Sequence, residues 1–505
     1  MTERSGTRSP TEATGRVAVV GAGAVGMTLA GRLAQHGAQV EVFESAASHE
    51  RIGSRAICMH RETLEIWARI GIGQQVADGG VSWRIGRTYY RGRELFSVAL
   101  PHSNEHFPPF VNISQSEVEE LLEARLEELG VAIHRGHRLT GLRQDDGGVD
   151  ATFETDAGAE TRRFGWLVGA DGAHSAVRHA IGMPFDGYTF DDRFLIADIR
   201  ADLPFSNERH FHFDPPWNAG RQVLIHPQPD GVWRIDWQVP ADADAEGERR
   251  SGALDRRIRQ LIGPGTAYEL VWLTAYRFSQ RLAGSFRDGR VFLAGDAAHV
   301  MSPFGARGLN SGIADAENLA WKLAAVVRGE APSTLLLTYI AERRAAAREN
   351  LAATDATMRF MAPRGVTRRA WRNLVLRMAP HSAWFRSRVD SGRLAEPARY
   401  RSVGPGDGSL PRHGSVAPDV PLASGGRLRA RLGQGFVVVA PQRIEAPLPV
   451  EVVGPQTAYG DTRAWLVRPD GYLADSARLR DVGGWLDSAL ERARSGAPAL
   501  ERSPR

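Results

Sequence analysis

One stretch of the sequence, residues 289–327, reads GRVFLAGDAAHVMSPFGARGLNSGIADAENLAWKLAAVV. Its apolar residues 291–294 predict a short, buried strand of a parallel sheet, which ends in a Gly295-Asp296 turn. A loop with proline and glycine follows, and from about Asn310 the apolar residues recur at helical spacing. The stretch therefore predicts a strand, a loop and a helix, with one carboxylate just beyond the end of the strand.

Such a unit has two features that suit a ligand. An aspartate at a strand end can hold a chain of hydroxyl groups, and a helix start offers free N–H groups and a positive dipole end to an anion. Both features serve one ligand only if that ligand lies between them. A strand, loop and helix without any ligand would show the same pattern, so this stretch alone leaves both interpretations open.

A dinucleotide fingerprint lies near the start of the chain. Residues 16–20 predict a strand, GAGAVG follows at 21–26, and a helical pattern leads to a second strand at 39–43 that ends in Glu44. In this context the first glycine allows a tight turn, the second lets a pyrophosphate approach, and the third lets the helix pack closely on the strand. The glycines are Gly21, Gly23 and Gly26, and Glu44 would accept the ribose hydroxyl groups. Glycine-rich packing without a nucleotide is the alternative.

A second strand-end aspartate lies between these two segments. Residues 164–168 predict a buried strand, and Asp171 follows it in the sequence GADG. From 183 to 286 the pattern changes to that of an antiparallel sheet rich in aromatic residues. Because this sheet is inserted between Asp171 and Asp296, we expect one of its faces to cover whatever the nucleotide-binding part holds.

Composition excludes several classes of protein. The 505 residues include 42% hydrophobic ones, enough for more than one core, and the net charge of +4 comes without a basic block that would indicate a nucleic-acid surface. The single cysteine, Cys58, excludes a disulfide framework and a CxxC pair, and no metal site is predicted. With a polar N-terminus and no apolar run that could span a bilayer, we expect a soluble, cytoplasmic protein.

Three segments together resemble one family. GAGAVG (21–26), GADGAHSAVR (169–178) and GDAAHVMSPFGARGLN (295–310) are similar to the motifs of the class A flavoprotein aromatic hydroxylases, which include para-hydroxybenzoate hydroxylase. The resemblance covers about residues 16–360. VRPDGYLA (467–474) resembles the redox-inactive, thioredoxin-like domain of the phenol hydroxylase and hydroxyphenylpropionate hydroxylase branches.

This resemblance implies an α/β fold with a Rossmann-type FAD-binding domain, an inserted antiparallel β-sheet substrate domain and a C-terminal thioredoxin-like module. Without a CxxC pair, that module would have a structural or oligomerisation role, and a homodimer is compatible with it. The predicted division of the chain is a disordered tail at 1–15, an FAD-binding domain at 16–182 and 284–355, a substrate domain at 183–283, a helical linker at 356–404 and the C-terminal domain at 405–495.

The resemblance also implies roles for individual residues. Asp296 would bind the ribityl chain of FAD, and Asp171 and Arg178 would serve both FAD and NAD(P)H. Pro303 would lie beside the reaction face of the flavin. The remaining FAD contacts implied are Arg55 and Gln115, together with Gly308, Leu309 and Asn310 against the pyrimidine edge.

The implied reaction is hydride transfer from NADPH or NADH to FAD, followed by reaction with O2 to a flavin C4a-hydroperoxide that hydroxylates an electron-rich phenolic ring. Such chemistry needs a pocket that excludes water and a base near the substrate hydroxyl. The candidate bases are His212, His226, Tyr188 and Asp236, and none of them stands out in the sequence. The substrate is either a small phenol or hydroxyaryl carboxylate, or an aromatic polyketide that undergoes hydroxylation, epoxidation or Baeyer–Villiger oxidation.

Other flavoprotein classes fit less well. A disulfide reductase would need paired cysteines, and a two-nucleotide monooxygenase would need a second complete fingerprint. IDWQVP (235–240) is close to the tryptophan-rich motif of flavin halogenases, but those enzymes use a lysine after the fingerprint, and the only lysine here is Lys322. A flavin-binding protein without catalytic activity remains a different-class alternative.

Overall fold

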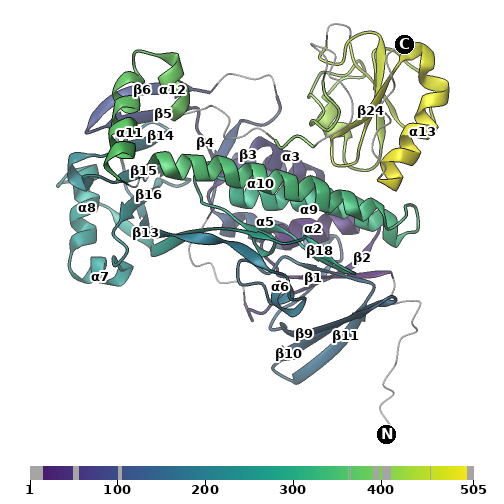
Figure 1. Cartoon of the computed structure of the whole chain (residues 1–505), viewed down its shortest axis with the longest axis horizontal. Helices are drawn as coiled ribbons and strands as arrows, with labels where there is room; N and C mark the ends of the chain where they lie inside the picture. Colours follow the sequence, from purple (N-terminus) through teal and green to yellow (C-terminus); the bar gives the residue numbers. More distant parts are fainter. Residues whose placement is uncertain are drawn as a thin grey trace.

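The computed structural model describes residues 15–48, 56–100, 105–361, 363, 365–389, 397–400, 411–454 and 457–496. Most of the predicted tail (1–14) and Arg55 lie outside these residues, as do 362, 364, 390–396 and 401–404 of the predicted linker and 405–410 of the predicted C-terminal domain. A long helix, α10 (Leu335–Met361), runs through the middle of the molecule, with a large sheet at one end and a C-terminal module at the other (Figure 1).

A six-stranded sheet forms the base of the nucleotide-binding part, in the order β18-β19-β12-β1-β2-β8. All strands except the edge strand β18 run parallel. Their apolar runs are buried on both faces, as expected of strands covered on both sides. The strands are β1 (Arg16–Val20), β2 (Gln39–Phe43), β8 (Ala132–His134), β12 (Trp166–Gly169), β18 (Arg287–Asp288) and β19 (Val291–Leu293).

The register of this sheet aligns the ends of its strands. Val20 lies opposite Phe43 on one side and Gly169 on the other, and Gly169 lies opposite Leu293. The residues that follow these strands therefore gather at one edge. This confirms the prediction that the fingerprint and both strand-end aspartates belong to one region of the fold.

Helices cover one face of this sheet and a small antiparallel sheet covers the other (Figure 1). The central helix of the covering layer begins at Arg307, three residues before the predicted start near Asn310. The helices are α2 (Ala24–Gln35), α3 (Arg61–Ile70), α4 (Gly73–Gly79), α5 (Gln115–Glu128) and α9 (Arg307–Val327). The small sheet consists of β9 (Arg138–Asp145), β10 (Gly148–Thr155) and β11 (Gly158–Phe164), the last of which was not predicted.

The inserted sheet has eight strands in the order β20-β17-β13-β16-β15-β14-β5-β6. The strands of the predicted segment, 183–286, pair with one another antiparallel, as expected. Strands β5 and β6 from earlier in the chain extend this sheet, and because β5 pairs with β14 in parallel the complete sheet is mixed. Strands β13 and β17 pair with each other along most of their length. The strands are β5 (Ile85–Tyr90), β6 (Arg93–Ala99), β13 (Phe185–Arg200), β14 (Glu208–Phe213), β15 (Gln222–Pro227), β16 (Val232–Val239), β17 (Glu269–Ala283) and β20 (His299–Val300).

The two faces of this sheet have different partners. Leu195, Ile235 and Trp237 pack on one face against α8 (Ala253–Ile262) in a core of their own. The alternate residues of the same strands point to the opposite face. That face lies toward α10, and the short helices α11 (Val366–Met378) and α12 (Ala383–Val389) flank it (Figure 1).

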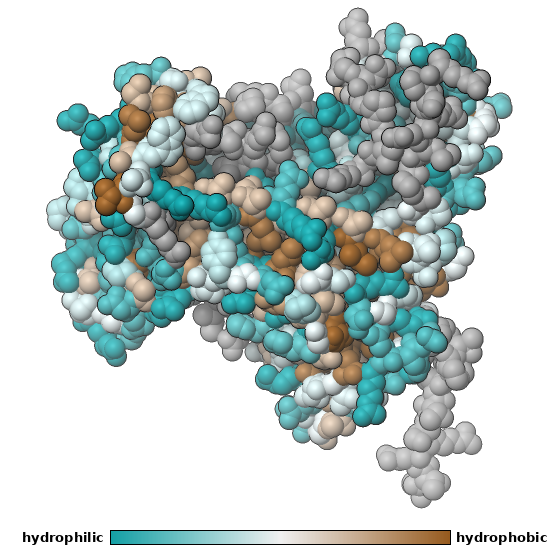
Figure 2. Space-filling view, in the orientation of Figure 1, coloured by the Kyte–Doolittle hydropathy of each residue, from teal (hydrophilic) through white to brown (hydrophobic). Residues whose placement is uncertain are grey.

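Short elements connect these layers. Strands β3 (Cys58–His60), β7 (Phe110–Asn112) and β4 (Val81–Ser82) form a three-stranded sheet, α6 (Ala176–Ala180) follows β12, and α7 (Ala245–Arg250) precedes α8. Hydrophilic and hydrophobic side chains are interspersed over the visible face (Figure 2). Among the described helices, none combines the length and the apolar composition needed to cross a bilayer.

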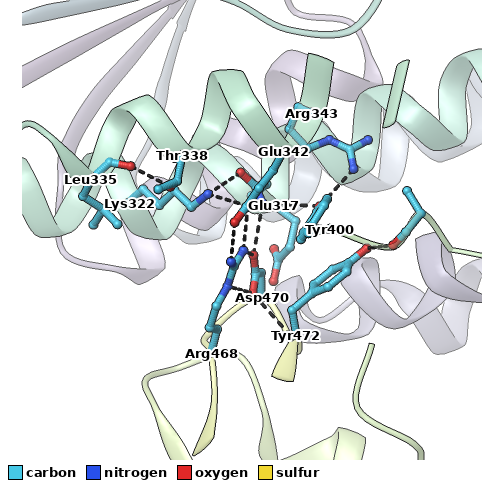
Figure 3. A network of polar contacts seen from close by, with 12 residues as sticks. Glu317, Lys322, Leu335, Thr338, Glu342, Arg343, Tyr400, Arg468, Asp470 and Tyr472 are labelled. Carbon is cyan, nitrogen blue, oxygen red and sulfur yellow. Dashed lines mark hydrogen bonds and ion pairs between the residues drawn. The ribbon is translucent and has the colours of Figure 1, made fainter. Parts of the chain in front are cut away.

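The C-terminal module contains a four-stranded sheet, β22-β21-β23-β24, and the helix α13 (Val482–Ser495). Its core is continuous with the central helices, because Trp321 of α9 and Leu335 of α10 belong to the same apolar cluster as Trp485. Polar contacts join the same elements: Arg468 of the module donates to Glu342 on α10 at 2.6 and 2.9 Å (Figure 3). The strands are β21 (Val437–Ala440), β22 (Val450–Val452), β23 (Arg463–Val467) and β24 (Leu473–Arg478).

Candidate functional site

The nucleotide-binding edge and the inserted sheet share one cavity of about 1150 Å³. On one side it is lined by the residues after β1, β12 and β19, on another by the cavity-facing side of the inserted sheet, and α10 and α11 complete it. Pockets for a single small molecule usually measure about 300–1,000 Å³. This cavity therefore has room for more than one ligand.

Two glycines of the fingerprint are required by the backbone. Gly21 has φ 107°, and a Cβ there would lie 2.5 Å from the carbonyl oxygen of Ala170. A Cβ on Gly26 would lie 2.0 Å from the carbonyl oxygen of Gly21. The tight turn and the close packing predicted for these positions are confirmed. Gly23 caps the N-terminus of α2 and lines the cavity, so the first N–H groups of this helix start at the cavity wall.

Glu44 lies directly after β2 and is tied to the glycine turn. Its carboxylate accepts hydrogen bonds from the N–H groups of Ala22 at 2.8 Å and Ala46 at 2.9 Å. These bonds fix the carboxylate at the strand-end edge. Ribose binding by Glu44 stays a prediction.

Helix α5 starts beside the nucleotide-binding turn. It begins at Gln115 and is capped by Ser114, whose side chain accepts from the N–H of Ser116. Glu119 in its first turns accepts a hydrogen bond from the N–H of Ala24 at 3.1 Å and from Gln115 Nε2 at 2.8 Å. Gln115 lines the cavity, and its contact with FAD stays a prediction. Glu119 supports the N-terminus of α2, a role that the sequence did not reveal.

Asp171 and Arg178 are not placed in the cavity lining, although Ala170 and Gly172 are. The carboxylate of Asp171 accepts from the N–H of Val177 at 3.1 Å, and burial raises its pKa. Arg178 is buried and donates to the carbonyl oxygens of Ala173 at 2.8 Å and Ala297 at 3.0 Å. Arg178 thus ties the loop after β12 to the turn that carries Asp296, while the contacts of Asp171 and Arg178 with FAD and NAD(P)H stay predictions.

Asp296 faces the cavity from the turn after β19. It is exposed, whereas Gly295 and Ala297 on either side of it are buried. Behind the turn, the buried carboxylate of Asp315 accepts from the N–H of Gly295 at 3.1 Å. The turn therefore rests on a second carboxylate on α9.

The side chains of His299 and Arg343 hold the carboxylate of Asp315 in place. His299 Nε2 lies 2.6 Å from Oδ2, and Arg343 Nε on α10 donates to Oδ1 at 2.7 Å. Burial alone would raise the pKa of Asp315, but His299 and Arg343 hold that pKa below its usual value. The anion is thus stable inside the protein and fixes the position of the Gly295-Asp296 turn.

The loop before α9 and the first turn of that helix contain four residues that were predicted to contact FAD or lie beside it, and three of them line the cavity. Pro303, Gly308 and Leu309 line the cavity, but Asn310 does not. Because α9 starts early, Asn310 lies on its buried side, where its amide oxygen accepts from the N–H of His60 at 2.9 Å and from Thr63 Oγ1 at 2.6 Å. Asn310 thus anchors α9 to its neighbours, and its contact with the pyrimidine edge of a flavin stays a prediction.

The sheet side of the cavity is aromatic with a few polar groups. Its aromatic residues are Phe194, Phe211, Trp272, Tyr276 and Phe278, and its polar ones include Arg209, His226, Arg234, Asp236 and Thr274. The two arginines and most of the aromatic residues were not predicted. Alternation along each strand marks them as one face, but the sequence does not show which face meets the cavity.

Two candidate bases lie elsewhere. His212 stacks on Tyr89 at a centroid distance of 4.5 Å, and burial lowers its pKa to about 4. Tyr188 is exposed and donates to the carboxylate of Asp355. Neither residue lines the cavity, which leaves His226 and Asp236.

Comparisons with known proteins agree with this geometry. Residues 14–354 match the protein family described as "FAD binding domain". The chain is 36% identical to 6-methylpretetramide 4-monooxygenase of Streptomyces rimosus over 342 residues, 66% of this chain and 60% of that protein. It is 33% identical over 365 residues to 3-(3-hydroxy-phenyl)propionate/3-hydroxycinnamic acid hydroxylase of Comamonas testosteroni. This match covers 71% of this chain and 61% of that protein. The matches thus span about three fifths of these relatives.

A solved structure matches nearly the whole chain. The OxyS anhydrotetracycline hydroxylase from Streptomyces rimosus superposes with a TM-score of 0.78 at 30% sequence identity. The match covers 96% of this chain and 100% of that one. The C-terminal module is therefore included in the shared architecture.

Proposed function

Because this chain belongs to the class A flavoprotein aromatic hydroxylases, we propose that it is an FAD-dependent monooxygenase that uses NAD(P)H and O2 to add one oxygen atom to an aromatic substrate. The observation that carries the proposal is the shared cavity. It joins a nucleotide cradle to an aromatic wall, so a flavin held by the first would meet a substrate bound on the second.

The residues present fit FAD. The turn at Gly21, the start of α2 at Gly23 and the exposed carboxylate of Asp296 would supply the donors and acceptors that a pyrophosphate and a polyol chain need. When bound, FAD supplies the electron transfer and oxygen activation that no side chain provides. The first turn of α9, with Gly308 and Leu309, presents a helix N-terminus to the cavity and would favour negative charge there.

The protein's own contribution to the reaction is enclosure and orientation. Phe194, Phe211, Trp272 and Phe278 make a wall that stacks on a flat ring and keeps water away from it. The cavity has room for more than one ligand, so we propose a substrate with several fused rings rather than a single-ring phenol. The relatives named for tetracyclic substrates support this choice, and the hydroxyphenylpropionate hydroxylase supports the single-ring alternative.

We further propose that the C-terminal module is thioredoxin-like and has no redox role. It contains no cysteine, and it packs on α9 and α10 rather than on the cavity. NADPH or NADH would act as a visiting co-substrate, because the sequence has one complete dinucleotide fingerprint. Hydride transfer would then need no second nucleotide domain.

The proposed function predicts substrate-stimulated consumption of NAD(P)H by the purified, FAD-loaded protein. Polyhydroxylated anthraquinones and tetracyclic phenols should stimulate it more than simple phenols, with a product heavier by one oxygen atom. The measurement is NAD(P)H oxidation with each compound, followed by mass analysis of the product. A protein that binds FAD but shows no stimulation with either group would instead be a non-catalytic flavoprotein.

Asp296→Ala should weaken FAD binding roughly 10- to 100-fold. Hydrogen bonds to a charged group contribute about 1.5–3 kcal/mol, and each 1.4 kcal/mol is a factor of ten in affinity. Fluorescence titration of the apoprotein with FAD measures the change. Asp288→Ala is the matched control, because Asp288 is exposed on the neighbouring β18 and does not line the cavity. Equal FAD affinity of the two variants would contradict the assigned role.

A further inference from the structure

Two neighbouring strands place incompletely bonded polar groups on the wall of the cavity. Asp236 on β16 and His226 on β15 line it, and both side chains are only partly buried. Within the described part of the chain, Oδ1 of Asp236 and Nδ1 of His226 are buried and have no hydrogen-bond partner. Buried polar atoms are normally bonded, and an exception calls for a reason such as a missing ligand group.

The surroundings of Asp236 explain why it lacks a partner. Its neighbours across the strands are Ile196 on β13 and Leu224 on β15, both apolar. The nearby cation is Arg234, but its guanidinium binds Asp198 through Nε at 2.8 Å and Nη2 at 2.7 Å. Asp198 is therefore paired with Arg234, whereas Asp236 faces the cavity without a bond to that guanidinium.

This environment alters the acid strength of both groups. Burial raises the pKa of Asp236 to about 7, while Arg234 lowers it and Asp198 raises it further. Burial, with Arg209 and Arg234, lowers the pKa of His226 to about 3, so this imidazole is neutral and a weak base. A general base works best when its pKa lies near the working pH, which favours Asp236 over His226.

We propose that Asp236 is the catalytic base that takes the proton of the substrate's phenolic hydroxyl, and that His226 binds a second polar group of the same substrate. The proposal rests on the proposed function of this cavity. In the step, the phenolic O–H bond breaks and a new O–H bond forms on the carboxylate of Asp236. The electron pair stays on the phenolic oxygen, which makes the ring more electron-rich and thus more reactive toward an electrophilic oxygen.

The positions of the two groups define a class of substrate. His226 lies opposite Arg234 in the register, so it is the diagonal neighbour of Asp236, a relation that separates two residues by roughly 7–8 Å. A flat substrate that meets both groups must carry an ionisable hydroxyl and a second oxygen or nitrogen substituent along one edge. Fused polyphenols meet this requirement, whereas a plain monophenol would leave one of the two groups without a partner.

Asp236→Asn tests the proposal, and Asp230→Asn on the exposed turn of the same β15–β16 hairpin is its control. At pH 7 the first variant should lose roughly 10²- to 10⁴-fold in kcat/KM, the usual contribution of a general base. The wild type and the control should gain activity as the pH rises through about 7, because only the ionised carboxylate accepts a proton. Asp236→Asn should lack this rise and recover activity only near the pKa of the free phenol.

Electron-withdrawing substituents lower the pKa of the phenol, so they should reduce the difference in kcat/KM between Asp236→Asn and the wild type. Equal kcat/KM and an equal pH profile for Asp236→Asn and wild type would overturn the assignment. If the wild type hydroxylates none of the compounds, the proposed function fails instead, so the two failures are distinguishable.

A measurement on the wild type alone guards against a variant that does not fold. The wild-type kcat/KM should follow a single ionisation near pH 7, and binding should weaken when the second polar substituent of the substrate is removed. A wild-type kcat/KM that does not change between about pH 6 and 8 would also overturn the role of Asp236.

Discussion

Gly26→Ala is expected to abolish FAD binding, lowering the affinity more than 100-fold. The added methyl carbon would lie 2.0 Å from the carbonyl oxygen of Gly21, a backbone atom that no rotamer change can move. Relief requires α2 to shift away from β1, and overpacking of this kind typically costs about 1–3 kcal/mol of stability. Because Gly21 and the start of α2 form the nucleotide cradle, that shift also removes the binding geometry. FAD content after purification and titration of the apoprotein measure the effect.

Gly31→Ala is the matched control on the same helix. A Cβ there would meet only side-chain carbon atoms of Leu126 at 3.4 Å and Ile70 at 3.5 Å. Alanine is favoured over glycine inside a helix by roughly 0.5–1 kcal/mol, so this variant should keep its FAD and its stability. A Gly26→Ala protein that purifies with as much FAD as Gly31→Ala would show that the close packing of α2 is unimportant for binding.

Arg343→Met is expected to destabilise the protein by about 3–5 kcal/mol, the usual cost of removing one partner of a buried ion pair. Arg343 is buried on α10, where it binds Asp315 at 2.7 Å. It also donates to the hydroxyl of Tyr400 at 2.9 Å (Figure 3). Methionine fills the space but leaves the carboxylate of Asp315 without its guanidinium. The turn before Asp296 loses its fixed support, so FAD affinity should also fall about tenfold. Urea unfolding with and without FAD measures both effects.

The loss of stability caused by Arg343→Met should depend on pH. The pKa of Asp315 is lower in the folded protein than in the unfolded chain, so its ionisation stabilises the fold above the unfolded value near 4 and that contribution is lost at lower pH. The decrease in the free energy of unfolding caused by Arg343→Met should therefore be largest near pH 7 and become smaller at lower pH. Arg348→Met, which alters an exposed arginine on the same helix, should change stability by less than 1 kcal/mol. Equal effects of the two variants would argue against the buried pair.

Local sequence patterns were enough to predict the central strands of the nucleotide-binding sheet. Strands β1, β2, β12 and β19 are apolar runs that end in glycine or an acid, and a parallel sheet aligns such ends whatever the rest of the chain does. The requirements at Gly21 and Gly26 follow in the same way, because backbone geometry within one strand, turn and helix imposes them. These features depend on residues close together in the chain.

The roles of several motif residues were not predictable. Asp171, Arg178 and Asn310 belong to the motifs, yet their side chains bind backbone and neighbouring side chains instead of lining the cavity. Glu119 reaches the start of α2 from 95 residues away, and no spacing rule connects the two. Motif membership identified the right loops but did not distinguish residues that face the cavity from residues that support those loops.

The sequence by itself determined the strands that end at the cavity edge, the three loops that follow them and the family, since these follow from periodicity, glycine placement and short-range geometry. Only the tertiary structure decided that Asp236 and His226 face the cavity while His212 faces away. Alternation along a strand separates residues into two faces but does not say which face is covered by which layer. That choice, and the pKa of each buried group with it, depends on contacts between segments that are far apart in the chain.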